Sequence, residues 1–154
     1  MHPAIRIAPF ALLVLAACSN DPAPEPVAAV PAGPQVSAPA SVATSRQIML
    51  GLVIPAADVV WGAANEVPAD DAAWEKVQAS AVMIAEAGGL MMTGNRVVDQ
   101  AEWVAYAKAM ADAATAAAAA AAEKNVDKVS DAGNTLYETC DTCHAKYMAA
   151  RQTQ

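Results

Sequence analysis

The feature that most constrains how this chain can fold is a Cys-x-x-Cys-His motif near its C-terminal end, formed by Cys140, Cys143 and His144. On a helix, positions i, i+3 and i+4 share one face, so the two thiols and the imidazole would point to the same side. Thiols at this spacing bond covalently to the vinyl groups of a haem, while the adjacent imidazole binds its iron. The motif therefore predicts one covalently attached c-type haem on a helix.

Other chemistries of a cysteine pair fit the chain less well. A tetrahedral zinc site needs two further ligands, but the chain's other His and Cys are His2 and Cys18, both in a predicted export segment. A redox-active Cys-x-x-Cys pair would be expected beside a βαβ unit, which the sequence does not indicate. A plain disulfide would leave His144 without a role.

Composition favours a small helical domain. The chain has 154 residues, of which 56% are hydrophobic, and alanine dominates while alternating runs of Val, Ile and Thr are scarce. Its length allows one domain at most. The net charge of −7 leaves no basic stripe that could meet phosphates, so we expect no nucleic-acid partner.

Residues 1–18 are typical of a bacterial export signal. A short polar start is followed by an apolar stretch that is too short to span a membrane permanently. The stretch ends in Leu15-Ala16-Ala17-Cys18, which resembles the lipobox of lipoproteins and predicts lipidation of Cys18. An ordinary signal cut after Ala17 is the alternative. Because Ser19 rather than Asp follows the cysteine, we expect a periplasmic domain anchored to the outer membrane.

Residues 19–44 contain six prolines and almost no large apolar side chains. Such a segment cannot bury enough surface to offset the entropy of ordering it. We expect a disordered, semi-rigid tether between the lipid anchor and the folded domain.

The folded domain is expected to span residues 45–151 as an all-α, antiparallel four-helix bundle. Pro55 should bend the first helix, because proline lacks a backbone donor. Gly88 and Gly89 are expected to end or loosen the second helix. The helical periodicity predicts helices from Thr44 or Ser45 to about Ala64, from about Asp70 to Met91, from about Asp99 to Ala122, and from Val126 to Arg151 with the haem motif on its core-facing stripe.

An exported four-helix bundle with this motif near the end of its last helix resembles the cytochrome c′ family, which includes a low-spin branch with a Met as sixth iron ligand. The residues that carry the resemblance are Arg46-Gln47 in the first predicted helix and Gly133, Cys140, Cys143, His144 and Tyr147 in the last. The resemblance implies that Cys140 and Cys143 hold the haem and that His144 is the proximal ligand. It also implies that Arg46 lies near the haem propionates, although a solvated arginine is an equal interpretation. Family members are often homodimers.

The sixth iron ligand separates two functions. A gapless count from Arg46 places Leu50 over the iron, which would leave it five-coordinate, whereas a small change of helix phase would place Met49 there. A thioether ligand at Met49 suits outer-sphere electron transfer. The chain also departs from the family at Met148, where many members carry a basic residue.

Three functions follow. With Met49 as ligand, the protein would be a periplasmic electron carrier that cycles Fe(III)/Fe(II) with redox partner proteins. With Leu50 over the iron, it would bind small gases such as NO or CO. A lipoprotein interaction module with a Cys140–Cys143 disulfide is the third interpretation. No nucleophile–base pair, carboxylate cluster or phosphate loop indicates an enzyme.

Overall fold

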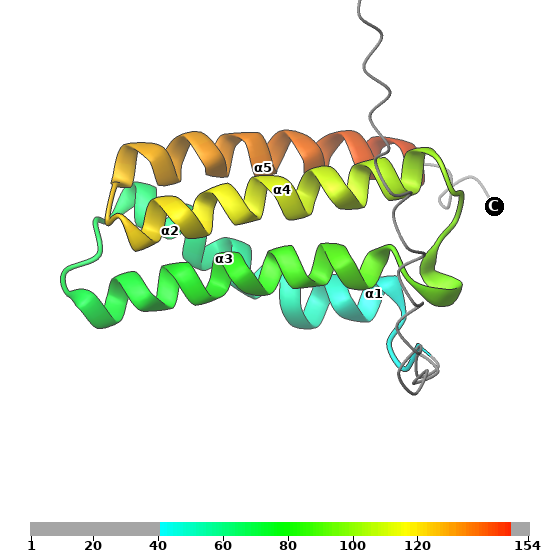
Figure 1. The fold of residues 1–154 in the computed structure, drawn as a ribbon, viewed down its shortest axis with the longest axis horizontal. Coiled ribbons are helices and arrows are strands. Elements are labelled where there is room, and N and C mark those ends of the chain that lie inside the picture. Colours follow the sequence, from blue (N-terminus) through cyan, green and yellow to red (C-terminus); the bar gives the residue numbers. More distant parts are fainter. Residues whose placement is uncertain (1–40, 149–154) are drawn as a thin grey trace, which may run out of the picture. The chain divides into compact units, whose positions relative to one another are not determined.

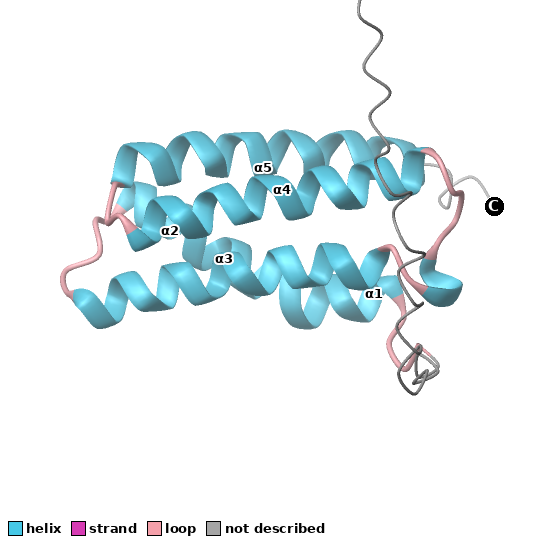
Figure 2. Ribbon diagram, in the orientation of Figure 1, coloured by secondary structure: helices cyan, strands magenta, loops and turns pink. Residues whose placement is uncertain are grey.

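The structure is a computed structural model that describes residues 41–148, and within this range all regular structure is helical. Four long helical segments pack against one another (Figures 1 and 2), which confirms the predicted all-α fold. The predicted signal segment with Cys18, the tether up to residue 40 and the predicted end of the last helix lie outside the described residues. The segments are α1 (Ser45–Ile48) continuing through a π-helical turn (Met49–Val53) into α2 (Ile54–Asn65), then α3 (Asp71–Met91), a 3₁₀ turn (Gly94–Arg96), α4 (Glu102–Ala122) and α5 (Val126–Tyr147).

The first segment begins at a capping box and contains a widened turn. The Thr44 side chain accepts a hydrogen bond from the Gln47 backbone, and the Gln47 side chain accepts one from the Thr44 backbone. The π-helical turn over Met49–Val53 ends just before Pro55. A proline ring collides with the carbonyl four residues earlier in a regular helix. The irregularity predicted at Pro55 therefore takes the form of a widened turn ahead of it.

Gly88 and Gly89 were predicted to end or loosen the second helix, and the first of these alternatives is wrong, because α3 continues to Met91. Gly88 lies directly against α4. A methyl group added at Gly88 would come 2.8 Å from the Ala107 carbonyl oxygen and 2.8 Å from the Ala111 methyl carbon. The glycine is therefore explained by the close approach of two helices rather than by a helix end.

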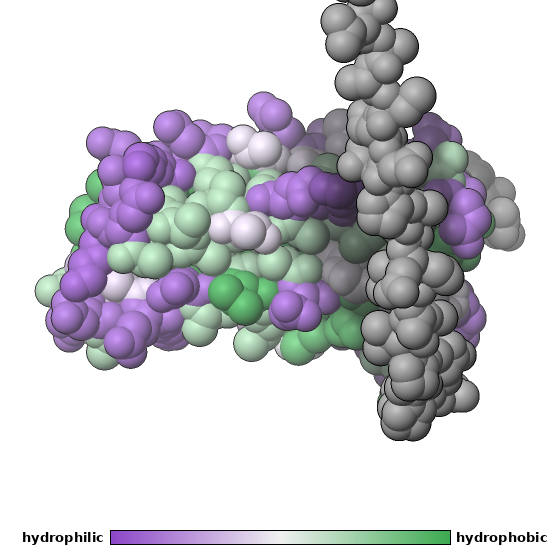
Figure 3. All heavy atoms as spheres, viewed as in Figure 1, coloured by the Kyte–Doolittle hydropathy of each residue, from purple (hydrophilic) through white to green (hydrophobic). Residues whose placement is uncertain are grey.

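The alanine run of α4 continues this contact. The six alanines between positions 113 and 121 that are buried in the structure lie in the shared hydrophobic core. Small side chains let neighbouring helices approach closely. On the face shown in Figure 3, pale-green surface of weak hydrophobicity runs along α3 and α4 between hydrophilic margins.

Side chains join the ends of neighbouring helices. Lys124, just after α4, forms an ion pair of 2.7 Å with Asp71 at the start of α3. At the other end of the same pair, the Trp103 indole near the start of α4 donates a 2.7 Å hydrogen bond to the Met91 carbonyl at the end of α3. These contacts hold the α3–α4 pair at both ends.

Arg96 ties the connection between α3 and α4 to the start of the first helix. Its side chain is buried, and it donates hydrogen bonds to the carbonyl oxygens of Leu90 (2.6 Å) and Ala43 (3.1 Å) and to the Thr93 hydroxyl (2.6 Å). These acceptors replace water for most of the guanidinium. The sequence offered no signal for this role, because the partners belong to separate segments.

The helix over 45–65 is long and apolar enough to cross a membrane by length and composition alone. In the structure its residues Ile48, Val53 and Val60 are buried in the core that it shares with the other helices. A core helix of a water-soluble domain passes the same test. The segment therefore forms one wall of the bundle in the described part of the chain.

Candidate functional site

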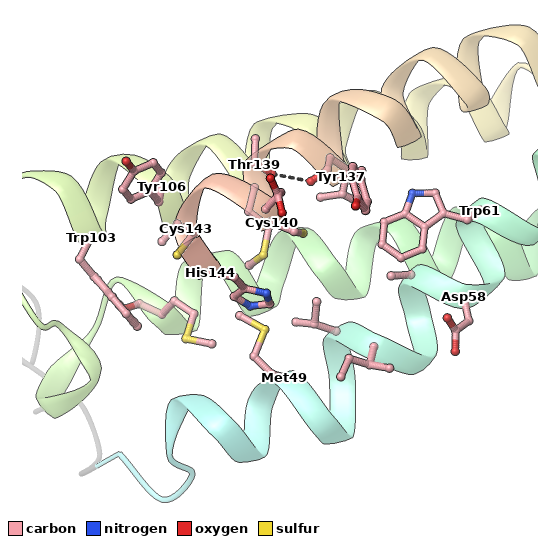
Figure 4. Close-up of a pocket in the computed structure, with 18 residues that line it drawn as sticks. Met49, Asp58, Trp61, Trp103, Tyr106, Tyr137, Thr139, Cys140, Cys143 and His144 are labelled. Atoms are coloured by element: carbon pink, nitrogen blue, oxygen red, sulfur yellow. Dashed lines mark hydrogen bonds between the residues drawn. The ribbon is translucent and has the colours of Figure 1, made fainter. Parts of the chain in front are cut away.

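A cavity of about 320 Å³ lies between the first helical segment and α5, with residues of α3 and α4 at its back. Figure 4 shows the side chains that line it. Its walls are largely apolar, which suits a flat hydrophobic group more than a polar ligand. The lining includes Met49, Val53 and Ala57 from the first segment, Met91 from α3, Trp103, Ala107 and Met110 from α4, and Leu136, Cys140, Cys143 and His144 from α5.

The Cys-x-x-Cys-His motif lies on one face of α5, as its spacing predicts. Cys140, Cys143 and His144 all line the cavity, and both cysteines are half-buried free thiols. Burial raises the pKa of both thiols. Redox-active Cys-x-x-Cys pairs show the opposite shift, because their chemistry requires an accessible thiolate. The surroundings of these thiols therefore differ from those of a dithiol oxidoreductase.

Met49 faces the motif from the opposite wall. Its side chain is half-buried and lines the cavity, and Figure 4 shows its thioether directed toward the imidazole of His144. Leu50 is 51% exposed and does not line this cavity. Met49 is also the first residue of the π-helical turn. The helix thus widens where the sequence left open whether Met49 or Leu50 faces the motif.

A second cavity of about 440 Å³ adjoins the first, with Met49, Met91, Trp103, Cys143 and His144 lining both. Arg46, Leu50, Tyr147 and Met148 line only the second. Arg46 is exposed and forms no ion pair or side-chain hydrogen bond with the described residues. Its guanidinium is therefore available to a carboxylate in this cavity.

The end of α5 is fastened to the start of α4 by Tyr147 and Asp99. The Tyr147 hydroxyl donates to the Asp99 carboxylate, which also accepts from the backbone of Glu102 and Trp103. The Tyr147 ring packs edge-on against Trp103, with ring centroids 5.0 Å apart. The hydrogen bond from Tyr147 lowers the pKa of Asp99, while burial and that hydrogen bond raise the pKa of Tyr147 to about 12.

The contacts of Asp99 were only partly predictable from the sequence. The sequence predicted that this helix begins near Asp99, but α4 begins at Glu102 and Ala101 is the residue before it. Asp99 still accepts hydrogen bonds from the Glu102 and Trp103 backbone in the first turn. The contact with Tyr147 was missed, because the two residues are 48 positions apart. Glu102 forms an ion pair with Lys146 instead of completing the capping box.

Gly133 has a specific neighbour that explains it. The Trp61 indole donates a 3.0 Å hydrogen bond to the Gly133 carbonyl, and a methyl group at Gly133 would lie 3.2 Å from the indole ring. Trp61 also packs edge-on against Tyr137, with ring centroids 6.2 Å apart. Gly133 therefore lets α5 approach Trp61 beside the cavity.

Two large side chains on α5 and α3 are exposed. Tyr137 is 60% exposed at the edge of the cavity, and Met83, on α3, is 43% exposed. Tyr137 lies three positions before Cys140 on the same side of α5, and it lines the cavity with the motif while the rest of its ring is exposed. Met91, the last residue of α3, is buried and lines both cavities.

Donors of the kinds that hold a c-type haem therefore converge on one apolar space. Two thiols and an imidazole lie on one wall, and a thioether lies on the other. Among residues 41–148, no three His, Cys, Asp or Glu side chains are grouped so that they could hold a metal ion by themselves. The residues present fit a haem, because the two thiols could bond to its vinyl groups and the imidazole and the thioether could bind its iron.

Comparison with known proteins provides no relative for this chain. No family model, no curated protein and no solved structure matches it. The interpretation of the site depends on its own residues, their contacts and the cavity.

Proposed function

We propose that residues 45–151 form a c-type cytochrome domain that carries single electrons. One observation carries the proposal: Cys140, Cys143 and His144 on α5 face Met49 of the first segment across one apolar cavity. In this proposal Cys140 and Cys143 hold the haem through thioether bonds, His144 is the proximal iron ligand and Met49 is the distal ligand. The haem supplies reversible Fe(III)/Fe(II) chemistry.

The protein's own residues would set the conditions for that chemistry. Val53, Ala57 and Leu136 give the cavity an apolar lining around the proposed haem, and a thioether ligand such as Met49 would raise the reduction potential. Arg46 would pair with the haem propionates at the second cavity, because its guanidinium has no partner among the described residues. The anchored end of α5 would keep His144 in place.

We further propose that the four helices form an antiparallel bundle. The contact of Lys124, after α4, with Asp71, at the start of α3, supports opposite directions for these two helices. Lys146 near the end of α5 pairs with Glu102 at the start of α4, which supports the same relation for the last two helices. Short connections favour this arrangement.

The sequence upstream of the domain places it outside the cytoplasm in this proposal. Export and lipidation at Cys18 would leave the domain on a tether of residues 19–44 in the periplasm, at the outer membrane. A Cys18→Ser variant should fractionate with soluble periplasmic proteins, whereas the unaltered protein should fractionate with membranes. Identical fractionation of the two would contradict the anchor.

The optical spectrum of the protein, produced in cells that attach haem to exported proteins, tests the central proposal. We expect a red protein whose haem survives extraction with acid and acetone, and a low-spin spectrum. A Met49→Ala variant should become high-spin. A Met83→Ala variant is the matched control, because Met83 is exposed on α3 and lines neither cavity. A colourless protein would contradict the cytochrome proposal, and a high-spin spectrum without substitution would contradict Met49 as ligand.

The second cavity favours one alternative function, the binding of small gases such as NO or CO. Leu50 lines that cavity beside Met49, so there is space next to the iron position for a small neutral molecule. With a five-coordinate iron, CO should bind the reduced protein rapidly and change its spectrum. With Met49 bound, CO should bind slowly, and the Met49→Ala variant should bind it faster.

A further inference from the structure

The two cavities beside His144 differ in charge at their edges. The first is lined by Asp58 and Asp141 and by no Lys or Arg, whereas the second is lined by Arg46 and by no Asp or Glu. If the propionates occupy the side with Arg46, the acidic side lies next to the uncharged edge of the haem. The entrance of the first cavity would then lead to the uncharged edge of the group, and its own charge is negative.

The acidic side chains at this entrance are not neutralised by the rest of the domain. Asp58 and Asp141 are exposed, as is Glu138 next to them on α5. Their carboxylates form no ion pair or hydrogen bond with the described residues. The four ion pairs in this part of the chain use Lys108, Lys124, Lys128 and Lys146 elsewhere.

An exposed aromatic ring lies among these carboxylates. Tyr137 is 60% exposed and packs edge-on against Trp61, which holds it in place from beneath. Figure 4 shows Asp58, Trp61 and Tyr137 at the same end of the cavity. Tyrosines that are supported from one side and exposed on the other are frequent centres of protein interfaces. We call Asp58, Tyr137, Glu138 and Asp141 the acidic entrance.

We propose that the acidic entrance is a docking surface for a basic partner protein. Complementary charges accelerate encounter and orient the partner, and the tyrosine supplies contact area at the centre. The net charge of −7 and the unpaired carboxylates at the entrance both disfavour an anionic partner or an anionic lipid surface. The proposed cytochrome function supplies only the reason for docking at this place, which is electron transfer to or from the haem.

A lysine-rich peptide is the probe that tests the docking surface on the purified protein with its haem reduced. Nuclear magnetic resonance should locate the largest peptide-induced shifts at residues 54–61 and 137–141. Replacing Asp58 and Asp141 together with Asn should weaken peptide binding about threefold to tenfold, and Tyr137→Ala about tenfold. Raising the salt concentration should weaken it further.

A double variant, Glu75→Gln with Asp127→Asn, is the matched control. Both residues are exposed, form no ion pair and line neither cavity, and their replacement changes the net charge by the same amount. We expect binding to weaken less than about twofold in this control. Equal weakening in both double variants, or shifts centred elsewhere, would overturn the proposal. Shifts at Tyr137 caused by neutral phosphatidylcholine vesicles but not by the peptide would overturn it in favour of a lipid surface.

The optical spectrum of the same sample separates this proposal from the proposed function. A protein without haem that shows the expected peptide shifts would contradict the cytochrome and leave the docking surface standing. A red protein without these shifts would contradict the docking surface alone.

Discussion

The α3–α4 pair and the pair formed by the first segment and α5 are packed in different ways. Between α3 and α4, Gly88 and a series of alanines bring the helices so close that one added methyl group would collide at 2.8 Å. Between the first segment and α5, the facing side chains of Met49, Cys140 and His144 border a cavity of about 320 Å³. One side of the domain is closed by its own residues, and the other encloses a space.

This difference would allow a small alanine-rich domain to accommodate the proposed haem. Alanine and glycine contribute little apolar area each, so the close pair provides a rigid back wall without consuming the larger side chains. Several of the larger side chains border the cavity instead, namely Trp61, Trp103, Met49, Met91, Met110 and Leu136. We infer that the haem would complete the core on that side, and the expected effects below test this view.

The largest expected effect is a difference in unfolding free energy between alanine substitutions of two fully buried side chains. Ile84 lies on α3 away from both cavities, so Ile84→Ala should leave a closed void and cost about 4–5 kcal/mol. Leu136 borders the first cavity, so Leu136→Ala should enlarge an existing space and cost about 2–3 kcal/mol in the haem-free protein. Chemical denaturation of both variants measures the difference. Equal costs would mean that the cavity side is packed as tightly as the α3–α4 side.

Two adjacent glycines test the closeness of α3 and α4. Gly88→Ala should lower the free energy of unfolding by about 1–3 kcal/mol, because its methyl group meets α4. Gly89→Ala is the matched control, since nothing lies within 4 Å of its added methyl group. That substitution should raise the free energy of unfolding by up to about 1 kcal/mol through helix propensity. A Gly88→Ala variant as stable as Gly89→Ala would contradict the close packing.

Removing the haem should accelerate amide exchange more beside the cavity than in the α3–α4 pair. In a Cys140→Ala, Cys143→Ala variant, amide exchange should be at least about tenfold faster in residues 49–58 and 136–147 than in the haem-bound protein, which corresponds to about 1.4 kcal/mol. Residues 81–91 and 107–118 should keep their protection, because α3 and α4 pack on each other directly. Uniform acceleration along the chain would contradict a self-sufficient α3–α4 pair.

The smallest effect concerns the contact between Tyr147 and Asp99. The pKa of Asp99 is lowered, so its contribution to stability is present above about pH 4 and is lost as the pH falls further. The pKa of Tyr147 is raised to about 12, so its contribution is present below about pH 10 and is lost as the pH rises to about 12. Tyr147→Phe keeps the ring against Trp103 and should remove the dependence above about pH 10 and weaken the dependence below about pH 4, because the Trp103 backbone still donates to Asp99. Melting temperatures across this pH range measure both. An unchanged pH profile would show that the hydrogen bond does not contribute.

Local signals in the sequence were enough to predict two helix caps and the common face of the Cys-x-x-Cys-His motif. Thr44 caps the first helix and Asp70 caps α3, because capping depends on residues within one turn. The spacing of Cys140, Cys143 and His144 places them on one face for the same reason. The prediction for Gly88 failed, because its role is set by Ala107 and Ala111 on another helix.

By itself, the sequence determined which segments are helical and where the first segment, α3 and α5 begin, since these properties arise from neighbours along the chain. Only the tertiary structure decided that Met49 rather than Leu50 faces His144, that Tyr137 is exposed, and that Asp99 holds Tyr147. These outcomes depend on the widened turn before Pro55 and on contacts between residues tens of positions apart. Helical periodicity carries no information about such contacts, because it repeats within one helix and does not specify the rotation of that helix against its neighbours.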